Sequence, residues 1–233
     1  MKIVLLPGLD GTGVLFRPFV ERLPRDLSPI VVSYPPDRQL GYELLLEIVL
    51  RHLPRDEPFV LLGESFSGPL ALMAAATCPA GLKAVVLCAT FVQNPTWIRW
   101  GGLASFVHPF AFRLYPKFSA AKALLGSYST PELRKLIAGA IGAVRPEVFS
   151  HRVREVLRVQ VADKLAACPV PILYLRGSRD LVVPGRNLRE IRELLPALQA
   201  ATLDAPHMVL QCQPAAAAQA VAHFVRGSSL RAA

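Results

Sequence analysis

The sequence predicts an α/β fold in which a mostly parallel sheet is covered by helices on both faces and carries one helical insertion. Short apolar runs rich in β-branched residues alternate along the chain with segments of helical spacing. These runs are apolar throughout, which is typical of strands buried on both faces. The chain has 233 residues and a hydrophobic content of 52%, enough for one large core.

The elements follow one another in a regular order. The first strand, at residues 2–6, stops at Pro7 because proline has no N–H for a neighbouring strand. We expect the further strands at residues 29–34, 58–63, 84–91, 171–176 and 198–203. We expect the helices at residues 14–23, 41–53, 68–78, 186–195 and 215–225. The third helical segment, GPLALMAAATC, consists largely of small residues that permit close packing on the sheet.

The segment of residues 92–163 breaks this alternation. It has helical spacing, no obvious strand and many aromatic side chains. Such an insertion often covers the carboxyl ends of the strands, where ligands bind. We therefore expect a helical cap at residues 92–163 on a core formed by residues 1–91 and 164–233. The predicted substrate-binding residues of the cap are Trp97, Trp100, Phe106 and Phe110. Ordinary packing of these aromatic side chains between helices is the alternative.

The motif GESFSG at residues 63–68 carries the strongest chemical signal. It stands between a predicted strand and a helix that begins with Pro69. A serine on a sharp strand-to-helix turn exposes its hydroxyl at the sheet edge, and the residues two before and two after it must be small. Gly63 and Ser67 meet this requirement for Ser65, the predicted nucleophile. A nucleophilic Ser67 would place Pro69 where it clashes with the turn, and a helix N-cap is the other alternative.

A serine hydroxyl needs a base and an orienting carboxylate to act as a nucleophile. His207 is the predicted base, because it follows the last strand and so lies at the same sheet edge as Ser65. Asp180 is the predicted carboxylate, because it follows the strand at residues 171–176. Asp204 is the alternative acid, although a residue three positions from His207 on a loop rarely approaches it correctly.

An oxyanion formed by attack on a carbonyl needs two backbone N–H donors. Phe66, the residue after the nucleophile, should supply one, and Leu9 in the loop PGLDGTG should supply the other, with Asp10 as the alternative. The glycines of this loop could instead mark a dinucleotide site. Their spacing is G-x-x-G-x-G rather than G-x-G-x-x-G, and that alternative leaves the serine, aspartate and histidine unexplained.

Composition argues against several other classes of protein. The net charge is +9, but the basic residues are scattered and form no nucleic-acid motif, so we expect no nucleic-acid partner. The four cysteines include no C-x-x-C pair, which argues against a zinc site or a disulfide framework. No apolar stretch is long enough for a membrane span, and the N-terminal run is too short for a signal peptide. We expect a cytoplasmic protein without a metal or an organic cofactor.

The motifs LLPGLDGTG, GESFSG, GSRDLVVP and APHMVLQ together resemble the successive motifs of the α/β-hydrolase superfamily, from residue 5 to residue 211. The resemblance implies an eight-strand type of sheet, shortened here by its first two strands, and a cap at the insertion. The loop PGLDGTG is similar to those of esterase- and acyltransferase-like members. We expect hydrolysis of a small carboxylic ester or thioester, free or carrier-bound, through an acyl-enzyme on Ser65. Acyl transfer with the same residues and a noncatalytic binding protein on this scaffold are the alternatives.

Overall fold

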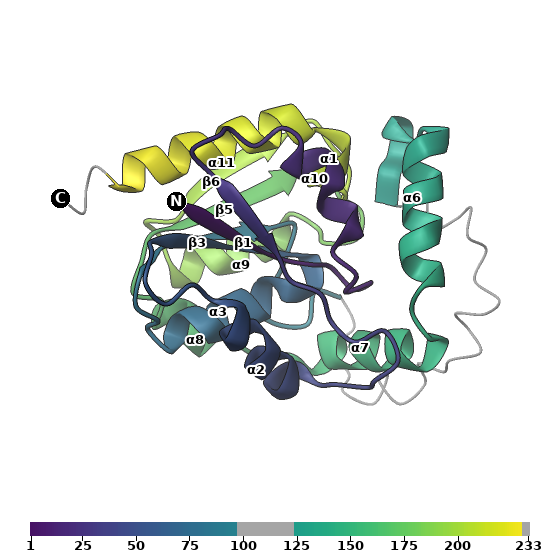
Figure 1. Ribbon diagram of the computed structural model, residues 1–233, viewed down its shortest axis with the longest axis horizontal. Helices are drawn as coiled ribbons and strands as arrows, with labels where there is room; N and C mark the ends of the chain where they lie inside the picture. The colour runs from purple at the N-terminus through teal and green to yellow at the C-terminus, as the bar shows by residue number, and fades with distance from the viewer. Residues whose placement is uncertain (97–123, 230–233) are drawn as a thin grey trace.

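The computed structural model describes residues 1–96 and 124–229 of the chain. Its centre is a six-stranded sheet in which every neighbouring pair of strands is parallel, in the order β2-β1-β3-β4-β5-β6 (Figure 1). The strands are β1 (Lys2–Leu6), β2 (Ser28–Val31), β3 (Phe59–Glu64), β4 (Leu82–Cys88), β5 (Ile172–Gly177) and β6 (Gln199–Leu203). The predicted α/β fold class is confirmed.

Both faces of the sheet are buried, as its apolar strands predict. Successive residues of a strand point to opposite faces, so Val4 and Leu6 of β1 join one core while Ile3 and Leu5 join the other. The first core is closed by α2 (Tyr42–His52), α3 (Gly68–Ala76), α8 (Ala162–Ala166) and α9 (Arg186–Leu194). The second is closed by α1 (Arg17–Val20), α10 (Val209–Cys212) and α11 (Pro214–Ser229), drawn above the sheet in Figure 1. No helix in the described part of the chain is long and apolar enough to cross a membrane.

Some element boundaries differ from the predicted ones. The helix expected at residues 14–23 is a 3-10 turn, η1 (Val14–Phe16), followed by the single turn of α1. The strand expected at residues 29–34 is shorter, because the chain leaves the sheet and the N–H of Tyr34 donates to the carbonyl of Gly11 at 2.7 Å. The short helix α10 has no counterpart among the predicted elements.

The segment of residues 92–163 leaves and rejoins the core at one place. The N–H of Val161 donates to the carbonyl of Val92 at 2.8 Å, and Gln93 and Gln160 form an antiparallel bridge. The segment contains η4 (Gly126–Tyr128), α6 (Pro131–Gly142) and α7 (Pro146–Arg158). Helix α6 stands beside the end of the sheet at which the strands finish (Figure 1). Four predicted substrate-binding residues lie outside the described part of the chain: Trp97, Trp100, Phe106 and Phe110.

Candidate active site

Ser65 stands on a strained turn between β3 and α3. It is the first residue of η2 (Ser65–Ser67), and its φ of 49° lies in the left-handed region that residues other than glycine rarely adopt. A Cβ atom at Gly63 would overlap the carbonyl oxygen of Ser67. Close backbone packing therefore explains why the sequence pattern requires a small residue two positions before the serine.

Gly63→Ala tests this close approach. We expect the substitution to lower the free energy of unfolding by about 1–3 kcal/mol, because the added methyl group meets backbone that cannot move aside. The matched control is Gly139→Ala in α6, where nothing lies within 4 Å of the added Cβ. It should raise the free energy of unfolding by roughly 0.5–1 kcal/mol, because alanine favours a helix. Urea denaturation measures both, and equal effects would contradict the packing described here.

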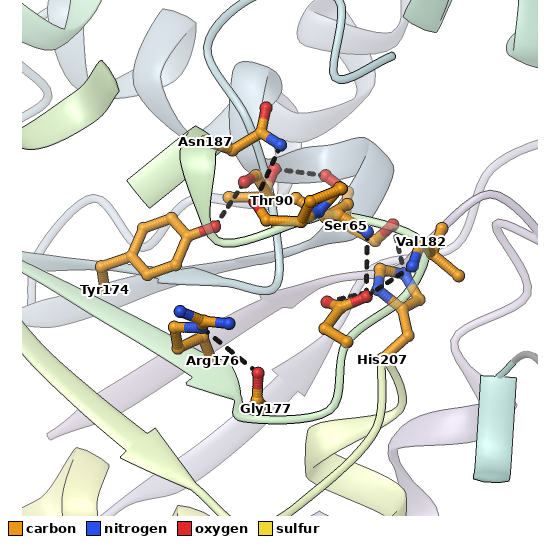
Figure 2. A network of polar contacts seen from close by, with 11 residues as sticks. Ser65, Thr90, Tyr174, Arg176, Gly177, Val182, Asn187 and His207 are labelled. Carbon is orange, nitrogen blue, oxygen red and sulfur yellow. Dashed lines mark hydrogen bonds and ion pairs between the residues drawn. The ribbon is translucent and has the colours of Figure 1, made fainter. Parts of the chain in front are cut away.

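A chain of hydrogen bonds links three side chains from the ends of different strands (Figure 2). His207 Nε2 lies 2.9 Å from Ser65 Oγ, and His207 Nδ1 lies 2.9 Å from Asp180 Oδ2. The second carboxylate oxygen of Asp180 accepts from the backbone N–H groups of Val182 and Val183, at 2.8 and 2.9 Å. Asp180 and His207 are both buried, so water competes little for these bonds. The structure thus brings together the predicted nucleophile, base and acid.

The alternative acid, Asp204, has other partners. Its carboxylate forms an ion pair with Arg179 at 2.7 Å, and its backbone carbonyl accepts from the hydroxyl of Tyr128 at 2.6 Å. The side chain of Asp204 is 57% exposed. Proximity to His207 in the sequence therefore does not identify the acid, because the carboxylate that contacts His207 comes from the loop after β5.

The loop after β1 lies directly beside the serine. A Cβ built on Gly8 would be 3.9 Å from Ser65 Cβ. The N–H of Gly11 donates to the carbonyl of Gly8 at 3.0 Å and closes a tight turn around Leu9 and Asp10. Within the described residues, the N–H groups of Leu9 and Asp10 find no acceptor. In the part of the chain that the structure describes, the loop therefore has two backbone donors near the serine that no protein group accepts.

The N–H of Phe66 is oriented by a threonine that the sequence analysis missed. Thr90 Oγ1 donates to the carbonyl of Ser65, and because C=O and N–H point in opposite directions across a trans peptide, the N–H of Phe66 points away from Thr90. Thr90 is itself held by the hydroxyl of Tyr174, which donates to its carbonyl (Figure 2). A Cβ at Gly68 would overlap the Thr90 side chain, so that glycine allows the close contact. The only sequence signal for Thr90 is a hydroxyl residue near a strand end.

Ser67, the other serine of the motif, has a separate set of contacts. Its side chain is fully buried, and its hydroxyl donates to the carbonyl of Pro7. Tyr34 donates in turn to Ser67 Oγ at 2.8 Å, and Tyr42 donates to the carbonyl of Phe66 at 3.0 Å. Ser67 thereby connects the serine turn to the loop after β1. A glycine at this position, as in the commoner form of the motif, could not make that connection.

A cavity of about 150 Å³ opens beside Ser65 and His207. Its apolar walls include Leu15, Leu124, Ile137, Ile141, Phe149 and Val182. Glu64, the residue before Ser65, also lines this cavity and accepts from Gln211 Nε2 at 3.0 Å. Burial raises the pKa of Glu64 to about 7. A larger hollow of about 620 Å³ between α2, α7 and α8 includes neither Ser65 nor His207, so the smaller cavity is the candidate site.

The parallel sheet and the serine on its strand-to-helix turn define an α/β-hydrolase fold. The chain belongs to the alpha/beta hydrolase family, whose model matches residues 3–222. A pimeloyl-[acyl-carrier protein] methyl ester esterase of Xanthomonas oryzae pv. oryzae is 30% identical over 216 residues, which cover 86% of this chain and 85% of that protein. The chain is accordingly an enzyme that hydrolyses esters.

Solved structures agree on the fold. A thermophilic esterase from Thermogutta terrifontis superposes with a TM-score of 0.82 and 21% identity, over 98% of this chain and 90% of its own. An enol-lactonase from Burkholderia xenovorans LB400 gives a TM-score of 0.79 and 17% identity, over 97% of this chain and 91% of its own. At these identities, the likeness concerns the arrangement of the elements and not the substrate.

Proposed function

We propose that this enzyme is a serine hydrolase that cleaves a carboxylic ester or thioester through an acyl-enzyme on Ser65. The main support is the pair of 2.9 Å hydrogen bonds that joins Ser65 through His207 to Asp180. Asp180 accepts from Nδ1–H, which leaves Nε2 of His207 free to take the proton of Ser65 as Oγ bonds to the carbonyl carbon. The same proton then passes to the leaving alcohol or thiol as its bond to carbon breaks. His207 next takes a proton from the water that attacks the acyl carbon. It returns this proton to Ser65 Oγ as the bond between Oγ and the acyl carbon breaks and the acid leaves.

The negative oxygen of the tetrahedral intermediate is proposed to bind the N–H groups of Leu9 and Phe66. Support comes from the N–H of Leu9, which finds no acceptor among residues 1–96 and 124–229, and from the orientation that Thr90 gives to the N–H of Phe66. Removing one such donor typically costs about 3 kcal/mol of transition-state stabilisation. No metal or organic cofactor is needed for this chemistry.

The proposed substrate has an apolar acyl chain and is bound to an acyl carrier protein. The carrier is suggested by the name of the Xanthomonas relative, and the net charge of +9 would attract an acidic partner. We further propose that residues 92–163 form a cap over the acyl chain, because Ile137, Ile141 and Phe149 of α6 and α7 line the cavity beside Ser65. A cytoplasmic location remains a prediction of the sequence.

The acyl-chain dependence of kcat/KM tests the proposed pocket. For p-nitrophenyl esters from acetyl to decanoyl, each added methylene should contribute about 0.8 kcal/mol, or roughly fourfold in kcat/KM, until the cavity is full. Ile141→Ala should lower kcat/KM for octanoyl more than for acetyl esters, because Ile141 lines the cavity. Leu136→Ala is the matched control, since Leu136 lies on the same helix but not among the residues that line the cavity.

A flat chain-length profile, or one that Ile141→Ala leaves unchanged, would show that this segment forms no acyl pocket. The same esters, assayed with and without an alcohol acceptor, distinguish hydrolysis from acyl transfer. We expect the free acid as the main product in both cases. A predominant new ester in the presence of the alcohol would favour the acyltransferase alternative.

A further inference from the structure

We propose that Arg152, a buried arginine of α7, is a positioning residue that fixes the oxyanion loop, defined as residues 7–13. The proposal rests on the proposed function, because it concerns the N–H groups that would hold the oxyanion. Arg152 lies outside every motif of the sequence and comes from the segment predicted to form the cap. It acts through the backbone of the loop and not by touching the reacting atoms.

The guanidinium of Arg152 is bound almost entirely by backbone carbonyl groups. Its Nη1 donates to the carbonyls of Leu9 at 3.1 Å and Asp10 at 2.7 Å, and its Nη2 donates to that of Pro35 at 3.0 Å. The residue is 1% exposed, and its guanidinium carbon lies 5.8 Å from the centre of the Tyr34 ring. Nε finds no acceptor within the described residues. Burying an arginine with one donor unsatisfied is costly, so the three bonds to the backbone must offset that cost.

These bonds set the orientation of the loop amides. Because C=O and N–H point in opposite directions across a trans peptide, the bond from Arg152 to the Leu9 carbonyl turns the N–H of Asp10 away from the guanidinium. The bond from Arg152 to the Asp10 carbonyl likewise turns the N–H of Gly11 away from the guanidinium. That N–H donates to the Gly8 carbonyl, so the N–H of Leu9, the proposed oxyanion donor, points away from Gly11. Without Arg152, the Leu9–Asp10 peptide could rotate and place a carbonyl where the oxyanion forms.

The four consecutive carbonyl groups of the loop all have donors. Ser67 binds that of Pro7, Gly11 binds that of Gly8, and Arg152 binds those of Leu9 and Asp10. The N–H groups of Leu9 and Asp10 have no acceptor in the described part of the chain. Among the backbone groups of residues 7–10, the carbonyl oxygens are therefore occupied while the N–H groups of Leu9 and Asp10 can donate to a negative oxygen. Arg152 supplies half of the bonds to these carbonyl oxygens.

Gly11 leaves the space in the loop that the Arg152 guanidinium occupies. Its φ is +70°, and a Cβ there would lie 2.5 Å from Nη1 of Arg152. A glycine therefore meets both the backbone requirement and the close approach of the guanidinium. Helix α7 is held nearby by two further contacts, from the N–H of Arg145 to the Pro36 carbonyl at 3.0 Å and from the N–H of Tyr42 to Glu155 at 3.3 Å.

The test compares Arg152→Met with Arg152→Lys and with a control on the same helix, Arg154→Met. Arg154 is partly buried, and its Nε donates at 3.4 Å to a carbonyl of its own helix, so its loss should not affect the loop. Each variant is assayed with a p-nitrophenyl ester and with an alkyl trifluoromethyl ketone. In the ketone complex, Ser65 Oγ bonds to the carbonyl carbon, His207 takes the proton, and the resulting oxyanion requires the same amides as the reaction.

We expect Arg152→Met to lower kcat about 10- to 100-fold, which is at most the loss caused by removing one oxyanion donor. KM should change less than about threefold. Ki for the ketone should rise by the same factor as kcat/KM falls. The kcat and Ki of Arg152→Lys should lie between those of Arg152→Met and of the wild type. A lysine keeps the charge but can donate to only some of the three backbone carbonyls. Arg154→Met should match wild type in kcat, KM and Ki.

Thermal melting decides which variant is informative, and if Arg152→Met does not unfold cooperatively, the comparison is made with Arg152→Lys. A lower melting temperature with unchanged kcat and Ki would mean that Arg152 only stabilises the fold, and would overturn the proposal. So would a rise in KM with unchanged kcat and unchanged ketone affinity. Failure of the ketone to inhibit the wild-type enzyme would instead refute the serine mechanism, which keeps the two proposals distinguishable.

Discussion

Ser65→Ala is expected to lower kcat by about 10⁴-fold or more while leaving the fold intact. The substitution removes the oxygen that we propose bonds to the acyl carbon, Ser65 Oγ, which lies 2.9 Å from His207 Nε2. Stability should change little or rise slightly, although alanine at this site keeps the unusual φ of 49°. Initial rates with a p-nitrophenyl ester, together with the melting temperature, measure the two effects.

Ser67→Ala is the matched control, two residues along the same turn. It removes the hydroxyl bonds to Pro7 and Tyr34, and so should reduce stability and lower kcat moderately. The assignment would be reversed if Ser65→Ala kept its activity and Ser67→Ala lost it. Equal losses of kcat in both variants would show that the substitutions disturb the shape of the turn rather than remove one nucleophile.

Asp180→Asn is expected to lower kcat by about 10⁴-fold, the loss seen when the carboxylate that orients a catalytic histidine becomes an amide. The Asp180 oxygen next to His207 accepts from Nδ1, whereas the N–H₂ of an asparagine turned toward His207 would donate and favour the wrong tautomer. The other oxygen can keep its bonds to the N–H groups of Val182 and Val183, so the loop should hold its shape. Values of kcat across a pH series measure the effect.

Asp204→Asn provides the comparison, since it makes the same chemical change three residues from His207. Asp204 is more than half exposed and forms an ion pair with Arg179, so its loss should cost at most about 1 kcal/mol of stability and little activity. An inactive Asp204→Asn beside an active Asp180→Asn would mean that the acid had been misassigned.

The sequence predicted the parts of the site that depend on local order along the chain. Ser65, Asp180 and His207 each follow a strand, and the carboxyl ends of parallel strands meet at one edge of the sheet, so their approach could be expected. The small residues around Ser65 were predictable for the same reason, because the turn itself requires them. The sheet followed from unbroken apolar runs, with errors mainly in where elements end.

The supporting contacts were not predictable, because they join segments far apart in the sequence. Arg152 contacts Leu9, 143 positions away, and Thr90 contacts Ser65, 25 positions away. A single sequence does not distinguish this arginine from other arginines on amphipathic helices, or this threonine from other threonines near strand ends. Glu64 stands next to Ser65 in the sequence, but only the packed structure shows that it lines the cavity.

The most direct test of the serine mechanism is to map the covalent product of the enzyme with p-nitrophenyl diethyl phosphate by mass spectrometry. The nucleophile takes the diethyl phosphoryl group and p-nitrophenolate leaves, so one stable adduct should form per molecule in step with the loss of esterase activity. The proposed serine mechanism predicts the adduct on Ser65 within the peptide that contains GESFSG, and none in Ser65→Ala. An adduct on Ser67 or any other residue that accompanies inactivation, or full inactivation without an adduct, would contradict it.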